Sequence, residues 1–208
     1  MILRQAAMAL LVVTLFSSEA ATAGPSAGEI VKLTADSVIQ RLEADKVVLQ
    51  AHPERVYELI QETVLPHFDF NIMSKWILGK SWAEASEAQQ QAFIEQFQTL
   101  LIRTYAKALL EYSDEIITYH PEEAGSKPNL AVVRTEVSSD GTSKTIPIDY
   151  RMYGRDGVWK VIDVSVDGVS LVGTYRGSFS AEIRKNGMDA LIAKLTERNS
   201  RQSDTQEE

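Results

Sequence analysis

The sequence predicts an α+β fold: a twisted antiparallel sheet of about four to five strands packs against a layer of helices, with an apolar cavity between them. First, hydrophobic residues recur at helical spacing up to about residue 113 and at every second position from residue 116. Second, Asp140-Gly141 and Asp156-Gly157 separate strand-like segments, as in hairpins. Third, helical spacing returns near the end. The order of helices, strands and helices is typical of this fold class.

The first 23 residues have the features of a signal peptide. Arg4 supplies the positive charge, Ala6 to Phe16 form the apolar stretch, and Ala21-Thr22-Ala23 is a small-residue cleavage site. The apolar stretch is shorter than the roughly 20 residues that a membrane-spanning helix needs. We therefore expect an exported protein whose mature chain begins at Gly24.

The composition limits the partners of the mature chain. The 208 residues carry a formal net charge of −8 and include no cysteine. An acidic chain is a poor ligand for nucleic acid or for an anionic membrane surface, and disulfides are excluded. We expect residues 24–198 to form a single domain. Residues 199–208 contain no apolar side chain, so we expect a disordered acidic tail there.

The N-terminal part predicts three helical segments. Apolar residues at helical spacing indicate a helix from Ala27 to Ala51. Pro53 suits the first turn of a second helix, which ends at Pro66. A short segment follows from Phe70 to Leu78 and is closed by Gly79.

The clearest helix begins at a capping box, Ser86 to Gln89, and runs from Ala88 to Ser113. Its apolar stripe is broad enough to require a partner wider than one helix, such as a sheet or a ligand-filled gap. The stripe comprises Phe93, Phe97, Leu100, Leu101, Tyr105, Ala108, Leu109 and Tyr112.

Four segments with a period of two follow this helix. They are Ile116–His120, Leu130–Ser138, Thr145–Gly154 and Val158–Asp167. We expect three-residue hairpin loops at Ser139-Asp140-Gly141 and Arg155-Asp156-Gly157, because the last residue of such a loop favours glycine. Two further helices are predicted, from Tyr175 to Lys185 and after Asp189, which suits an N-cap.

Loop length determines which strand residues face each other. With three-residue loops, Tyr150 lies opposite Ile162, and Ile148 lies opposite both Val164 and Val132. The even-numbered positions of three strands then form one apolar face, and the odd-numbered face is mixed. A two-residue loop would shift the pairing by one position.

No arrangement typical of a catalytic or metal site stands out. Ser170 lies in Gly168-Val169-Ser170-Leu171, which is not a nucleophile elbow. The histidines, His52, His67 and His120, are far apart and lack a second ligand at helical spacing. We expect no catalytic residue, no metal and no cofactor.

Asp149 and Asp163 are the strongest enzymatic alternative. The expected register places them opposite each other with Arg151 alongside, and two adjacent carboxylates would separate their pKa values as acid–base catalysis requires. The other interpretation is a solvated face on which Arg151 offsets the repulsion. A third hypothesis is a protein-interaction module with an ordinary dry core, because periodicity does not distinguish a filled core from a lined cavity.

Several motifs resemble those of the MlaC, or toluene-tolerance auxiliary, family over nearly the whole mature chain. They include Trp76-Ile77-Leu78-Gly79 with Trp82, Leu101 to Ala106, Val133 to Val137, Ile148 to Arg151, Trp159 to Val164, Gly168 to Val172 with Tyr175-Arg176 and Phe179, and Asn186 to Leu191.

The resemblance implies a non-enzymatic periplasmic phospholipid carrier that is a monomer and has lipid as its cargo. It would move lipid between an outer-membrane lipoprotein–porin complex and an inner-membrane ABC transporter with an MCE-domain ring, maintaining outer-membrane lipid asymmetry. The family fold implies acyl chains held between sheet and helices, with the headgroup near solvent.

Periodicity then predicts which residues line the lipid site. Arg134 lies near the margin, where it would contact the headgroup phosphate or form a surface ion pair. The predicted lining residues are Phe97, Leu101, Tyr105, Leu109, Val132, Ile148, Tyr150, Ile162, Val164, Val166, Leu171 and Tyr175.

Overall fold

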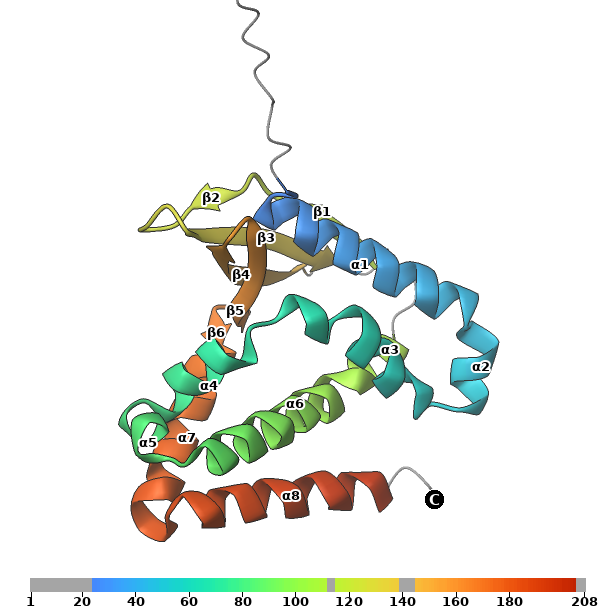
Figure 1. The fold of residues 1–208 in the computed structure, drawn as a ribbon. Helices are drawn as coiled ribbons and strands as arrows, with labels where there is room; N and C mark the ends of the chain where they lie inside the picture. The colour runs from blue at the N-terminus through green and yellow to red at the C-terminus, as the bar shows by residue number, and fades with distance from the viewer. Residues whose placement is uncertain (1–23, 112–114, 139–144, 205–208) are drawn as a thin grey trace, which may run out of the picture.

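A computed structural model describes residues 24–111, 115–138 and 145–204 (Figure 1). The predicted signal peptide, residues 1–23, lies outside the described residues. The predicted loop Ser139-Asp140-Gly141 and residues 205–208 also lie outside them.

The long N-terminal helix is divided in two. Helix α1 spans Ala27–Ala44 and α2 spans Lys46–Ala51, and Asp45 is the residue between them. Helix α1 starts at a capping box in which the Ser26 hydroxyl accepts from the backbone of Glu29, while the Glu29 carboxylate accepts from the backbone of Ser26. Helix α3, Arg55–Thr63, and the 3-10 helix η1, Leu65–His67, follow.

Helices α4, α6 and α8 begin close to their predicted positions, whereas α7 begins four residues before the predicted Tyr175 and α5 was not predicted. Helix α4 spans Phe70–Leu78 and ends at Gly79, whose φ of 57° favours glycine. Helix α5 is Lys80–Glu84 and α6 is Glu87–Leu110, with the predicted capping box at Ser86. Helices α7, Leu171–Asn186, and α8, Met188–Asp204, complete the chain.

The expected tail boundary at residue 199 is wrong. Helix α8 continues to Asp204, and Asn199 is buried. The Asn199 amide donates to the backbone oxygen of Gln96 at 3.0 Å, which gives this polar residue a place in the helix packing. The absence of apolar side chains therefore did not indicate disorder between residues 199 and 204.

The sheet is antiparallel, as predicted. Its strands are β1 Ile116–Tyr119, β2 Glu123–Ala124, β3 Leu130–Ser138, β4 Thr145–Arg155, β5 Val158–Val166 and β6 Val169–Ser170. The order is β1-β3-β4-β5-β6, and β2 also pairs with β3. The predicted fold class, an antiparallel sheet with helices, is confirmed.

The predicted register between β3 and β4 is wrong. Val133 lies opposite Tyr150 and Thr135 opposite Ile148, so Val132 is on the other face of the sheet. The pairing ends at Ser138 and Thr145, which leaves a connection longer than the three residues assumed. The odd-numbered positions of β3 therefore share a face with the even-numbered positions of β4.

The β4–β5 hairpin differs in two ways from its prediction. Its turn is the two-residue Asp156-Gly157, with φ values of 53° and 78°, as in a type I′ turn. A bulge with Ile162 as the extra residue then shifts the pairing once more. As a result, Tyr150 lies opposite Val164 and Ile148 opposite Val166, instead of the predicted Ile162 and Val164.

The core consists of three hydrophobic clusters, and the sheet and α6 belong to different ones. Figure 1 shows α1 along the sheet, with α6 and α8 side by side farther from it. The sheet cluster joins α1 to the sheet, the helix cluster joins α4, α6, α7 and α8, and the α3 cluster joins α1, α2, α3 and the end of α6. Phe68 contacts both the sheet cluster and the helix cluster, and Leu65 contacts both the helix cluster and the α3 cluster.

Candidate functional site

One face of the sheet, which we call the inner face, is almost entirely apolar. Directly paired residues of an antiparallel sheet point to the same side, so the register defines this face. It comprises Ile117, Tyr119, Ala131, Val133, Thr135, Val137, Ile146, Ile148, Tyr150, Met152, Val161, Val164 and Val166.

The closed end of the inner face, which consists of Ala131, Val133, Met152 and Val161, is dry core. Met152 is 0% exposed, and the other three are buried as well. The N-terminal half of α1 covers them with Ala27, Ile30 and Val31.

The open end of the inner face is apolar but only partly covered. It consists of Ile117, Val137, Ile146, Ile148 and Val166. Ile146 is 40% exposed, and the other four are half-buried. Apolar side chains that remain partly accessible next to a packed core are typical of an apolar ligand site.

The outer face of the sheet is polar. Arg134 forms ion pairs with Glu123 and, at 3.8 Å, with Asp149. His120 contacts the Glu136 carboxylate at 3.1 Å on the same face. Of the two alternatives for Arg134, the structure therefore shows the surface ion pair.

The predicted Asp149–Asp163 carboxylate pair is not formed. Asp149 lies opposite Ser165, whereas Asp163 lies opposite Arg151. Asp163 is buried and accepts hydrogen bonds from Ser170 Oγ at 2.6 Å and from Val172 N at 3.1 Å. Its carboxylate thus fixes the start of α7 to β5, and the bulge in β5 explains why the expected pairing failed.

Several predicted lining residues belong to the helix cluster. Phe97 is fully buried, stacks on Phe93 at a centroid distance of 5.8 Å and meets the edge of Tyr175 at 5.3 Å. Leu101 is buried in the same cluster. These side chains are occupied by protein contacts, and α1 rather than α6 packs on the sheet.

The C-terminal part of α6 is more accessible. Tyr105 is 39% exposed, and its pKa is raised by burial of the phenol and by the neighbouring phenol of Tyr175. Leu109 is partly buried against the α3 cluster. This part of α6 therefore presents apolar surface that the helix packing does not fully use.

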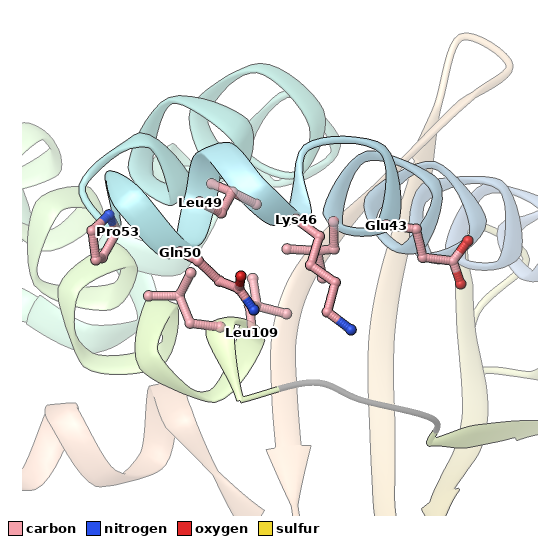
Figure 2. A pocket seen from close by; sticks show the side chains of 8 residues that line it. Glu43, Lys46, Leu49, Gln50, Pro53 and Leu109 are labelled. Carbon is pink, nitrogen blue, oxygen red and sulfur yellow. The ribbon is translucent and has the colours of Figure 1, made fainter.

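A cavity of about 240 Å³ lies where α1, α2 and α6 meet. Figure 2 shows Leu49, Gln50, Pro53 and Leu109 around it, with the charged groups of Lys46 and Glu43 at its edge. Leu42 and Leu110 complete the lining. Sequence reasoning missed its α1 and α2 residues, although Leu42 and Leu49 repeat at a spacing of seven, which indicates one helical face.

The cavity is close to the open end along the chain. Leu110, which lines the cavity, and Ile116, the first residue of β1, are separated by six residue steps, so their Cα atoms are at most about 22 Å apart. The cavity thus lies at the end of α6 from which the chain continues to β1.

The other predicted lining residues belong to β3, β4, β5 and α7 and lie in different environments. Ile148, Tyr150, Val164, Val166 and Leu171 meet in the sheet cluster. Burial raises the pKa of the Tyr150 phenol, and nearby Tyr119 adds to this, while a hydrogen bond with Thr135 opposes it. Ile162 is fully buried, and Val132 lies on the outer face.

Neither a metal-binding cluster nor a membrane-spanning helix is found among the described residues. Within the ranges that the structure covers, no three His, Asp or Glu side chains gather as a metal site would require. Likewise, no helix in those ranges combines the length and hydrophobicity needed to cross a bilayer.

The chain is similar to members of one protein family. The chain matches the MlaC protein family over residues 32–197. It is 28% identical to the toluene tolerance protein ttg2D of Pseudomonas putida over 162 residues, covering 77% of this chain and 74% of that protein. It is 23% identical to the intermembrane phospholipid transport system binding protein MlaC of Haemophilus influenzae over 168 residues, or 80% and 78% of the two chains.

A solved structure agrees with these relatives. The phospholipid-binding protein from Ralstonia solanacearum, solved in complex with a phospholipid, superposes with a TM-score of 0.79 at 30% sequence identity. The match covers 86% of this chain and 99% of that one.

Proposed function

Because this chain belongs to the MlaC family, we propose that it is a non-enzymatic phospholipid carrier. Acyl chains would lie against the open end of the inner face and the C-terminal part of α6, and the headgroup would remain at the surface. The observation that carries this proposal is that a continuous apolar face is covered by α1 at one end only. The phospholipid in the Ralstonia solanacearum structure supports it.

The size of the cavity bears on how lipid would enter. Its volume of about 240 Å³ is smaller than the roughly 300–1,000 Å³ typical of ligand pockets. A diacyl lipid would therefore need the end of α6 and the open end to move apart. Such movement is compatible with the packing, because the sheet and α6 belong to separate clusters, and Phe68 contacts both the sheet cluster and the helix cluster.

The energetics suit a carrier. Each acyl methylene removed from water contributes about 0.8 kcal/mol, so two long chains bind strongly relative to water. Relative to a bilayer, which buries the same methylenes, most of this free energy cancels. Contacts with partner proteins would then determine loading and release.

The family suggests where the carrier acts. We place it in the periplasm, after removal of residues 1–23, between an outer-membrane lipoprotein–porin complex and an inner-membrane ABC transporter with an MCE-domain ring. The name of the Haemophilus influenzae relative, an intermembrane phospholipid transport system binding protein, supports this proposal.

Native mass spectrometry of the purified protein tests the proposal. The wild-type chain should carry phospholipid, and Val166→Trp should reduce the lipid-bound fraction several-fold without lowering the melting temperature by more than a few degrees, because the half-buried open end has room for the larger ring. Val158→Trp is the matched control, since Val158 is on the same strand but is 52% exposed next to the β4–β5 turn. Equal lipid occupancy in both variants would reject the open end as the site.

A further inference from the structure

An exposed tryptophan and an arginine lie close together where α4 ends against α7. Trp76 of α4 is 36% exposed, although tryptophan side chains are usually well covered. The Arg176 guanidinium of α7 reaches the end of α4, where its Nη2 atom lies 3.9 Å from the position that a Cβ atom on Gly79 would occupy. Residues three apart on a helix are separated by about 5–6 Å, so the guanidinium lies within about 10 Å of the Trp76 Cβ atom.

Three cations at this end of α4 have no partner in the chain. Lys75, Lys80 and Arg176 are exposed, and over the ranges that the structure describes their side chains form neither ion pairs nor hydrogen bonds. Glu84 follows Lys80 by four residues without pairing with it, whereas cations of α1 and α6 do pair with carboxylates at that spacing. The end of α4 therefore carries an excess of positive charge in a chain whose formal net charge is −8.

The adjoining side of α7 is exposed and carries little side-chain material. Gly173 and Gly177 are exposed and one turn apart, and a Cβ atom on Gly177 would have no neighbour within 4 Å. Val172 and Phe179 occupy the opposite side of α7, in the helix cluster. Figure 1 shows α4, α5 and α7 together at one end of the molecule, away from β2. A glycine surface of this kind lets another chain approach the backbone closely.

The chemistry of this surface favours an acidic protein as its partner. Tryptophan and arginine are the residue types that contribute most to binding at protein interfaces. The planar guanidinium of Arg176 can bind a carboxylate through two parallel hydrogen bonds. An anionic bilayer would also attract these cations, but it would repel the rest of an acidic chain. A protein can place its carboxylates opposite this end of the carrier alone.

We propose that Trp76, Lys80, Arg176 and the exposed glycines of α7 form a docking surface for an acidic segment of a partner protein. The inference rests on the proposed function, since a lipid carrier has to dock on the proteins that load and unload it. Docking would cover the Trp76 ring and pair Arg176 with a carboxylate. Because α4 and α7 pack in the helix cluster, whereas the open end belongs to the sheet, the docking surface is separate from the proposed lipid site.

Binding of the purified chain to membrane vesicles from the source organism tests the proposal. Vesicles that expose the periplasmic face are prepared from the inner and the outer membrane, and liposomes of the extracted lipids serve as the comparison. The chain should bind vesicles of at least one membrane, and protease treatment of the vesicles or high salt should remove the binding. Trp76→Ala and Arg176→Glu should each raise the Kd about tenfold or more.

Two matched controls separate the docking surface from general charge and hydrophobicity. Lys127→Glu makes the same change from a cation to a carboxylate at an exposed lysine of the β2–β3 connection, which forms no ion pair with the residues described. Leu33→Ala removes an apolar side chain on α1 that is 62% exposed. Both variants should bind the vesicles with the Kd of the unaltered chain.

Native mass spectrometry keeps this test apart from that of the proposed function. All four variants should carry as much phospholipid as the unaltered chain, and a chain without lipid would reject the carrier but not the docking surface. If Trp76→Ala does not fold, the exposed substitution Arg176→Glu carries the test. Equal binding to liposomes and vesicles would overturn the proposal in favour of a lipid surface. Absent vesicle binding, or equal losses in variants and controls, would also overturn it.

Discussion

The two ends of the inner face have similar side chains but different environments. At the closed end, Met152 and Val133 are buried under α1, while at the open end Ile146 and Ile148 remain accessible. Both ends belong to the same strands with the same alternation. The alternation of residues along the strands therefore specifies an apolar face. The position of the covering helix determines which part of that face becomes buried core.

The path of α1 explains the difference. Ala27, Ile30 and Val31 of its first two turns pack on the sheet. Farther along, Val38 and Leu42 pack in the α3 cluster, beside α2 and the end of α6. Helix α1 therefore leaves the sheet about halfway along its length, and the open end begins where its cover stops.

The largest effect on stability is expected at the closed end. Met152→Ala should lower the free energy of unfolding by about 2–5 kcal/mol, because it leaves a cavity in a fully buried site. The fraction of protein with bound lipid should remain unchanged. Chemical denaturation and native mass spectrometry measure the two quantities, and a large loss of lipid with little loss of stability would reverse the assignment of the two ends.

Sequence reasoning predicted most helices and strands but not the register in which the strands pair. Helices α4 and α6 and strand β3 follow from caps and periodicity, which depend on neighbouring residues. The register failed because it depends on loop length and on the bulge at Ile162, which local patterns did not indicate. One signal was available: the even positions of β3 include Arg134 and Glu136, whereas the odd positions, from Ala131 to Val137, carry no charge.

The predicted lining residues lie in different parts of the fold. Ile148, Tyr150, Val164 and Val166 share the inner face, because the bulge restores the even-to-even pairing beyond Arg151. Phe97 and Leu101 are core residues of the helix cluster. Periodicity shows that α6 has a broad apolar stripe, but it does not show that α4, α7 and α8 cover that stripe while α1 covers the sheet.

A smaller effect is expected from weakening the cover of the closed end. Ser26→Ala removes the capping box of α1 and should lower the free energy of unfolding by about 1 kcal/mol. Fraying of the first turn should also increase hydrogen exchange at Ala131 and Val133, beneath that turn, more than at Val137. Ser86→Ala is the matched control, because it removes the capping box of α6, which does not cover the sheet. Equal changes in hydrogen-exchange protection at the closed and open ends would show that α1 does not cover one end more than the other.

The smallest effect on stability is expected at the most exposed inner-face position, Ile146. Ile146→Ser should change the free energy of unfolding by only about 0.5 kcal/mol, since the side chain is already 40% exposed. If acyl chains contact this side chain, losing its methylene groups should weaken lipid binding by about 1 kcal/mol, or roughly fivefold. Transfer of a fluorescent phospholipid to acceptor vesicles measures this change in lipid binding.

Ile116→Ser is the matched control, because Ile116 is nearby and 56% exposed but points to the outer face. If both variants retain lipid equally, exposure alone explains the open end. If only Ile146→Ser loses lipid, the uncovered half of the sheet is the surface that lipid occupies.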